Sequence, residues 1–123
     1  MKKILLIDDD LGVLFWLGET LVKAGLCALP ATSCRHAEEL LGRYGLSMDL
    51  VLVNPQLPGA AGLVFSLRRT TPQPKVIALI EDYDEVPMIP HADGFYRRPR
   101  PDELEEGAEQ LRALLGVLRD PIH

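Results

Sequence analysis

The sequence KILLIDDD occupies residues 3–10 and joins an apolar run directly to three carboxylates. A short, nearly continuous run of isoleucine and leucine is typical of a strand that is covered on both faces, as in a parallel sheet. In open α/β sheets, ligands bind beyond the carboxyl ends of the strands. We therefore expect residues 3–7 to form a buried strand, and Asp8, Asp9 and Asp10 to lie at a candidate site.

Three further apolar runs have the character of buried strands, and they lie at residues 49–53, 75–80 and 94–97. A weaker fifth candidate, at residues 26–31, contains Pro30. Because proline cannot donate a hydrogen bond to a sheet ladder, this strand should lie at an edge of the sheet.

Helical patterns alternate with these strands, at residues 13–24, 33–44, 62–69 and 104–118. Such alternation predicts an α/β fold, in which helices cover both faces of a parallel sheet. Right-handed crossovers leave few topologies, and the flavodoxin-like order 2-1-3-4-5 places the second strand at an edge, in agreement with Pro30. We therefore predict a doubly wound, five-stranded parallel sheet with this order.

The connection between the fourth and fifth strands departs from the regular alternation. It contains Pro87 and Pro90, which resist the interior of a helix. The helix expected there, the fourth of the fold, should therefore be shortened or missing. The length of 123 residues favours one domain, which we place at residues 1–120, with residues 121–123 as a C-terminal tail.

The composition disfavours several classes of function. Apolar residues make up 47% of the chain and charged residues 25%, a normal balance for a globular domain. The net charge of −5 gives no electrostatic reason to bind nucleic acid or an anionic membrane. No apolar stretch is long enough to span a bilayer, and the aspartates at residues 8–10 end the first apolar run too early for a signal peptide. We expect a cytoplasmic protein.

Three features follow the predicted strand ends in order. The acidic pair Asp8 and Asp9 follows the first strand, Asn54 and the loop PQLPGAAG at residues 55–62 follow the third, and a basic-proline pair beginning at Arg98 ends the fifth. Taken together, they make the whole chain resemble the receiver domains of two-component response regulators, a family with the CheY-like form of the flavodoxin-like fold.

The resemblance implies a role for each of these positions. In the family, a carboxylate after the third strand accepts a phosphoryl group, an acidic pair after the first strand holds Mg²⁺, and a hydroxyl and a lysine contact the phosphoryl group. The acidic pair is kept as Asp8 and Asp9, and the phospho-acceptor position holds Asn54. The remaining switch positions are filled by Ile80 in place of the hydroxyl, Arg98 in place of the lysine, and Phe95 as the aromatic residue.

These replacements predict that the chain is not phosphorylated. An amide is a poor nucleophile because its nitrogen lone pair is delocalised, so Asn54 should not form an acyl phosphate. Ile80 has no hydroxyl with which to bond a phosphoryl oxygen. Arg98 keeps the positive charge of a lysine, but its planar fork suits the pairing of carboxylates. We therefore expect no catalytic residue, and a phosphorylation-independent pseudo-receiver rather than an enzyme.

The acidic pair allows two interpretations. Asp8, Asp9 and the backbone carbonyl of Gln56 are the residual candidates for Mg²⁺ ligands, although the loss of a carboxylate at position 54 weakens such a site. We prefer an ion pair between Arg98 and Asp8 or Asp9 that replaces the charge of the metal, and we expect no cofactor. This pairing should leave Glu81 facing solvent or a different arginine.

A candidate partner surface lies on the first helix. Leu11, Phe15 and Val22 recur at helical spacing, with Gly18 between them, opposite the predicted core face, and Leu14 flanks this stripe. Scattered apolar side chains are common on protein surfaces, so an ordinary surface is the alternative.

The leading hypothesis is a signalling module that binds a protein partner, such as a histidine kinase, an output domain or a second copy of itself. One alternative is a degenerate receiver that is switched by Mg²⁺ or a small anion. The other is an enzyme with a flavodoxin-like fold. The sequence disfavours the enzyme because neither an uninterrupted Gly-rich phosphate motif nor a nucleophile–base pair stands out.

Overall fold

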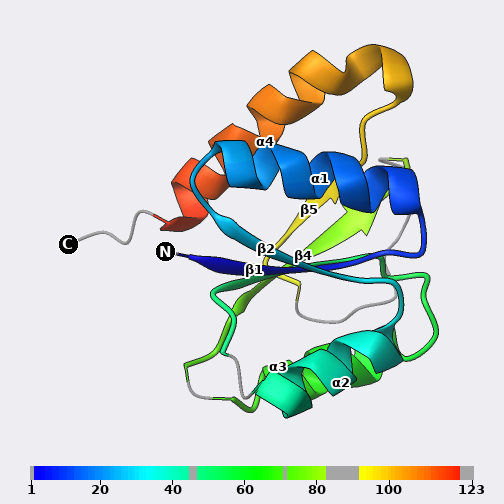
Figure 1. Cartoon of the computed structure of the whole chain (residues 1–123), viewed down its shortest axis with the longest axis vertical. Coiled ribbons are helices and arrows are strands. Elements are labelled where there is room, and N and C mark those ends of the chain that lie inside the picture. Colours follow the sequence, from blue (N-terminus) through cyan, green and yellow to red (C-terminus); the bar gives the residue numbers. More distant parts are fainter. Residues whose placement is uncertain (1, 45–46, 71, 83–91, 120–123) are drawn as a thin grey trace.

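Five parallel strands form a single sheet in the computed structural model, which describes residues 2–44, 47–70, 72–82 and 92–119 (Figure 1). The strands are β1 (Lys3–Ile7), β2 (Cys27–Ala31), β3 (Leu50–Val53), β4 (Lys75–Ile80) and β5 (Gly94–Arg97). Their order in the sheet is β2-β1-β3-β4-β5, and neighbouring strands are parallel. The predicted fold class and strand order are confirmed.

Helices cover the sheet on both faces (Figure 1). The helices α1 (Leu11–Lys23) and α4 (Leu104–Arg119) lie on one face, and α2 (Cys34–Tyr44) and α3 (Ala60–Leu67) lie on the other. A short 3₁₀ turn, η1 (Pro101–Glu103), leads from β5 into α4. Helix α4 is therefore the last helix that the sequence predicts.

Alternate residues of the central strands belong to two separate hydrophobic cores, one on each face of the sheet. In β1, Leu5 and Ile7 belong to the core under α2 and α3, whereas Ile4 and Leu6 belong to the core under α1 and α4. All four side chains are buried. The continuous apolar run in the sequence thus reflects a strand that is covered on both faces, as predicted.

The edge position of β2 is also confirmed, with Pro30 opposite Leu6 of β1. This strand begins at Cys27 rather than residue 26, because the backbone N–H of Leu26 donates to Leu21 and so belongs to the end of α1. Helix α3 begins at Ala60, earlier than the predicted start at residue 62. Gly59, with φ of 84°, sets the helix start immediately after itself.

Two expectations concern residues outside the described part of the chain. The shortened or missing helix before β5 falls mainly on residues 83–91, and the C-terminal tail is residues 121–123. Both stay predictions. Among the described helices, none combines the length and the apolar character that a membrane-spanning helix requires.

Candidate functional site

The carboxyl ends of β1, β3 and β5 bring three polar side chains to one edge of the sheet. Asp8 follows β1, Asn54 follows β3 and Arg98 follows β5. Each is held by a backbone hydrogen bond to the neighbouring strand: the N–H of Asn54 donates to Ile7 at 2.8 Å, and the N–H of Arg98 donates to Ile80 at 2.8 Å. The site is therefore positioned by the sheet ladder and not by a mobile loop.

Asp8 is the centre of this site and is fully buried. Its Oδ1 accepts hydrogen bonds from the backbone N–H of Asp10 at 3.1 Å and from Nδ2 of Asn54 at 3.4 Å. Its Oδ2 accepts from Nη1 of Arg98 at 3.1 Å. The Oδ1 of Asn54 accepts from the backbone N–H of Gln56 at 2.9 Å. Both carboxylate oxygens of Asp8 and both ends of the Asn54 amide are thus hydrogen-bonded.

Burial raises the pKa of Asp8 above its ordinary value of 3.8, since a charged carboxylate loses its hydration there. The hydrogen bond from Asp10, the charge of Arg98 and the hydrogen bond from Asn54 oppose this rise, while the neighbouring Asp9 adds to it. The site therefore stabilises one buried carboxylate with one cation and one amide, and a second buried carboxylate in place of the amide would be unfavourable.

The predicted ion pair between Arg98 and Asp8 is confirmed, and Asp9 is exposed instead. The expectation for Glu81 is wrong in part. Its side chain is 83% exposed, as expected for a group that faces solvent, yet its Oε2 lies 3.7 Å from Nη2 of Arg98. A guanidinium carries two terminal nitrogens, so Arg98 reaches Asp8 with one and Glu81 with the other.

The two other positions that the resemblance marks as switch residues lie at different levels of the sheet, since Ile80 is the last residue of β4 and Phe95 is the second residue of β5. Ile80 is buried at the end of β4, and Phe95 on β5 is largely exposed. Asp10, the third residue of the acidic run, is the N-cap of α1, and its Oδ1 accepts from the backbone N–H of Val13 at 3.2 Å. Asp10 is thus used to begin a helix.

Sequence reasoning missed an ion pair beside the site. Arg97 forms two hydrogen bonds of 3.1 Å to the carboxylate of Glu103, which also accepts from the backbone N–H of Arg100 at 3.2 Å. These bonds lower the pKa of Glu103, with the hydrogen bond from Arg97 as the largest cause. The pair shapes the turn that follows Arg98. A glutamate three residues after the residue that caps a helix was the available signal.

Comparison with known proteins places this geometry in a known fold. No protein-family model matches the sequence, and a comparison with curated protein sequences gives no match. Solved structures do match over nearly the whole chain. The chain has the fold of a receiver domain.

Three solved receiver structures illustrate the likeness. A putative response regulator from Chloroflexus aurantiacus has a TM-score of 0.74 and 22% identity, over 97% of this chain and 98% of its own. The chemotaxis response regulator CheY4 of Vibrio cholerae has a TM-score of 0.71 and 20% identity, over 94% and 99%. The response regulator TrrA from Thermotoga maritima, solved in complex with Mg²⁺-BeF, has a TM-score of 0.66 and 25% identity, over 90% and 99%.

The receiver fold implies a Mg²⁺ site at this edge of the sheet, and the residues present do not fit one. Both oxygens of Asp8 accept hydrogen bonds within the protein, and one of the donors is the cationic Arg98. Position 54 holds a neutral amide where a hard cation prefers a charged oxygen. Within the described residues, no three His, Cys, Asp or Glu side chains gather in a metal-binding arrangement.

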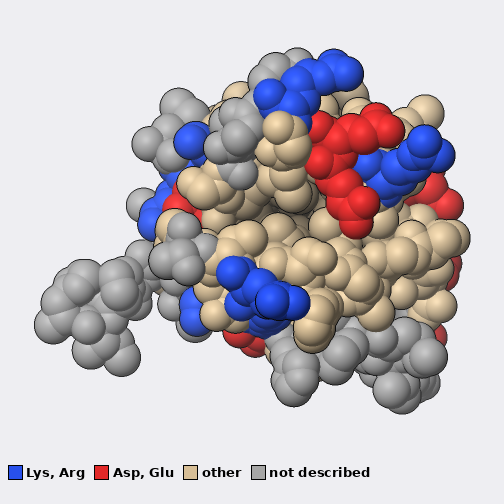
Figure 2. All heavy atoms as spheres, turned by 90° about the horizontal axis from the view of Figure 1, so that it is seen from below, with Lys and Arg blue, Asp and Glu red and all other residues tan. Residues whose placement is uncertain are grey.

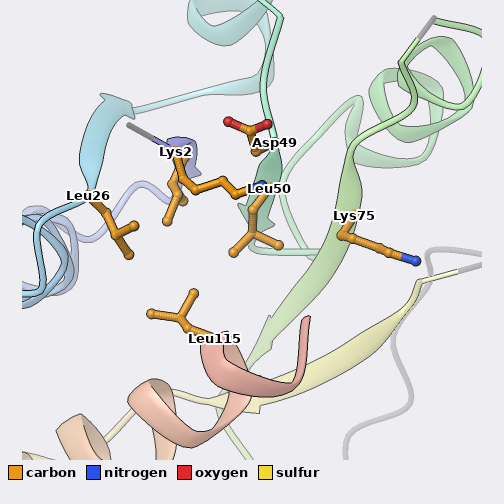
Figure 3. Close-up of a pocket in the computed structure, with 7 residues that line it drawn as sticks. Lys2, Leu26, Asp49, Leu50, Lys75 and Leu115 are labelled. Carbon is orange, nitrogen blue, oxygen red and sulfur yellow. The ribbon is translucent and has the colours of Figure 1, made fainter. Parts of the chain in front are cut away.

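Two of the hollows among the described residues lie at opposite ends of the sheet. A cleft of about 500 Å³ lies beside Arg98, and it is lined by Asp10, Val13, Glu81, Asp82, Arg98, Pro99, Arg100 and Pro101. At the other end, Leu26, Leu50 and Leu115 point toward one another around a pocket of about 50 Å³, from which Lys75 extends away (Figure 3). That second volume holds only a few atoms, and we assign it no function.

The candidate partner surface on α1 is confirmed as exposed, except for Leu14. Leu11, Phe15 and Val22 are 69%, 74% and 60% exposed, but Leu14 is only 6% exposed and packs in the core under α1. The prediction for Leu14 is therefore wrong. The buried residues of α1 are Leu14, Leu17 and Leu21, at intervals of three and four residues, so the buried face reaches Leu14 beside the exposed stripe.

Proposed function

We propose that this chain is a phosphorylation-independent pseudo-receiver, a cytoplasmic module that binds a protein partner without a phosphoryl signal. The single observation that carries the proposal is the hydrogen-bonded network of Asn54, Asp8 and Arg98. It occupies the edge of the sheet where, in the receiver family, the phosphoryl group and Mg²⁺ would bind.

Residues 54 and 55 together oppose phosphorylation: Asn54 is a poor phosphoryl acceptor, and Pro55 prevents its conversion to aspartate by the usual route. Asn54 offers no charged nucleophilic oxygen, and its Oδ1 is already bonded to the backbone N–H of Gln56. Deamidation to aspartate by the usual succinimide route needs the backbone N–H of the next residue. That residue is Pro55, which has none.

The network also opposes switching. Arg98 at the end of β5 is held to Asp8 at the end of β1, and these strands lie on opposite sides of β3 and β4. Ile80 provides no hydroxyl through which a bound anion would move the end of β4. A single arrangement of the strand ends favours a constant binding surface. Its partner would be a protein such as a histidine kinase or an output domain, with no role for nucleic acid or membrane.

Acetyl phosphate tests this proposal directly. The protein is incubated with acetyl phosphate and Mg²⁺, and its intact mass is measured by mass spectrometry under neutral conditions. We expect no added phosphoryl group, because no acyl phosphate forms on an amide. A receiver protein that keeps the acceptor aspartate serves as the positive control. An adduct that is stable at neutral pH and lost in base would overturn the proposal.

A further inference from the structure

The exposed stripe on α1 has the same spacing when it is followed in either direction. Leu11, Phe15, Gly18 and Val22 follow one another at intervals of four, three and four residues. Intervals of three and four give the seam along which two helices pack side by side. Because the same intervals appear when the stripe is followed backwards, a second copy of the helix in the antiparallel direction presents a matching seam.

We propose that two copies of this chain associate through an antiparallel pairing of their α1 helices. In this arrangement Phe15 of each copy lies over Gly18 of the other, and Leu11 of each lies against Val22 of the other. The pairing follows from the midpoint of the stripe, which falls between Phe15 and Gly18. A twofold axis through that midpoint produces all four contacts, as a closed dimer requires.

Size complementarity supports this pairing. Phe15 is the most exposed of the large apolar side chains in the described residues, and Gly18, one turn along the same stripe, has no side chain. A Cβ atom built on Gly18 would meet no atom within 4 Å, so the surface above it is open. The aromatic ring of one copy can therefore lie in the open space over Gly18 of the other. Because glycine has no side chain, the two helix backbones can also approach closely.

No charged side chain lies in the stripe to oppose the pairing of the two helices. None of the four stripe residues is charged, and the adjacent Glu19 and Lys23 pair with each other within one helix at 3.1 Å. The neighbouring edge strand β2 disfavours the other common route to a dimer. Pro30 in that strand provides no backbone N–H for the addition of a strand. Helix packing is thus the mode of association that this side of the molecule favours.

The expected dimer is weak. Even at about 150 Å² each, the low end of what an aromatic side chain buries, the three exposed side chains of each copy contribute only about 900 Å² in total. Stable interfaces bury about 1,200–2,000 Å², so the seam alone supports a dimer that forms reversibly with concentration. This inference is independent of the proposed function, because a monomeric chain would leave the chemistry of Asn54 unchanged.

Sedimentation equilibrium tests the proposal on the whole chain, from about 10 µM to 1 mM. We expect a monomer–dimer equilibrium that Phe15→Ser weakens by roughly tenfold or more. The matched control is Phe65→Ser, another exposed phenylalanine, which lies on α3. Figure 2 shows the face formed by α2 and α3, on the other side of the sheet from α1. We expect this control to leave the dissociation constant unchanged.

The substitution Gly18→Leu distinguishes the specific pairing of Phe15 with Gly18 from non-specific hydrophobic association. It adds apolar surface and raises helix propensity, so the monomer should fold at least as well as the unaltered protein. The leucine side chain also fills the open space over Gly18 that Phe15 of the other copy would occupy, so we expect it to weaken the dimer by roughly tenfold. A chain that stays monomeric up to 1 mM overturns the proposal. So does a Gly18→Leu variant that dimerises more tightly, or a dimer that Phe65→Ser weakens as much as Phe15→Ser does.

Discussion

At the scale of the residue, one atom separates Asn54 from the aspartate of a conventional receiver. An aspartate would place a second negative charge beside the buried Asp8, whereas the amide Nδ2 donates a hydrogen bond to it. The amide therefore balances a site that in the receiver family would need a metal ion. Asn54 and Arg98 act together in this respect, since each supplies a donor to a different oxygen of Asp8.

The substitution Asn54→Asp tests this balance. Without metal, we expect it to lower the free energy of unfolding by about 2 kcal/mol, because a hydrogen-bond donor is lost and two carboxylates face each other. Millimolar Mg²⁺ should recover part of this loss, since the new carboxylate supplies a charged oxygen ligand. The measurement is urea denaturation with and without Mg²⁺.

The unaltered protein and Asn54→Ala are the controls for this experiment, because neither has a carboxylate at position 54. Both should show the same stability with and without Mg²⁺. If Asn54→Asp were as stable as the unaltered protein without metal, the electrostatic account of Asn54 would be wrong.

At the scale of the element, α4 lies close against β5 and the residues that follow it, at Gly107. The hydroxyl of Tyr96 donates to the carbonyl of Gly107 at 2.6 Å. A Cβ atom on Gly107 would lie 2.6 Å from Cβ of Pro99, which is closer than carbon atoms approach without displacement. Gly107 is therefore required for the helix to lie against the end of β5, next to Arg98.

We expect Gly107→Ala to destabilise the protein by about 1–3 kcal/mol, because overpacking forces α4 away from Pro99. Gly116→Ala is the matched control in the same helix. A Cβ on Gly116 meets nothing within 4 Å, so alanine there should raise the stability by about 0.5–1 kcal/mol through helix propensity alone. Thermal denaturation of both variants would decide the matter, and a stabilising Gly107→Ala would contradict the packing argument.

The same scale shows what the sequence could predict. The buried strands were predictable because both of their faces are apolar, and the Arg98–Asp8 pair was predictable because parallel strands end at one edge. The burial of Leu14 was not, since α1 carries two overlapping apolar stripes and tertiary packing selects between them. The Arg97–Glu103 pair was not predicted either, because it depends on how the chain turns after β5.

At the scale of the whole molecule, the carboxyl groups of Asp8 and Glu103 respond to pH in opposite directions. The pKa of Glu103 is lowered below 4.5, chiefly by its hydrogen bonds from Arg97, so the unfolded chain binds a proton more readily than the folded one. Ionised Glu103 therefore stabilises the fold above pH 4.5, and this contribution is lost as the pH falls through its lower folded pKa.

Asp8 has the contrary effect. Its pKa is raised above 3.8 by burial, so the folded protein holds this proton more tightly than the unfolded chain does. Ionisation of Asp8 therefore lowers the stability as the pH rises above 3.8. In the acidic range, the change in stability of the whole protein reflects both groups, and a variant is needed to separate them.

Glu103→Gln removes the stabilising group and leaves Asp8 in place. We expect the unaltered protein to exceed this variant in stability by an amount that grows as the pH rises through the lowered folded pKa of Glu103 and stays constant above 4.5. Urea denaturation at a series of pH values measures the difference. Glu105→Gln, an exposed glutamate in the first turn of α4, is the control and should track the unaltered protein. A difference for Glu103→Gln that did not change with pH would show that the pairing of Glu103 with Arg97 contributes no charge-dependent stability, and that the β5–α4 turn is held by packing alone.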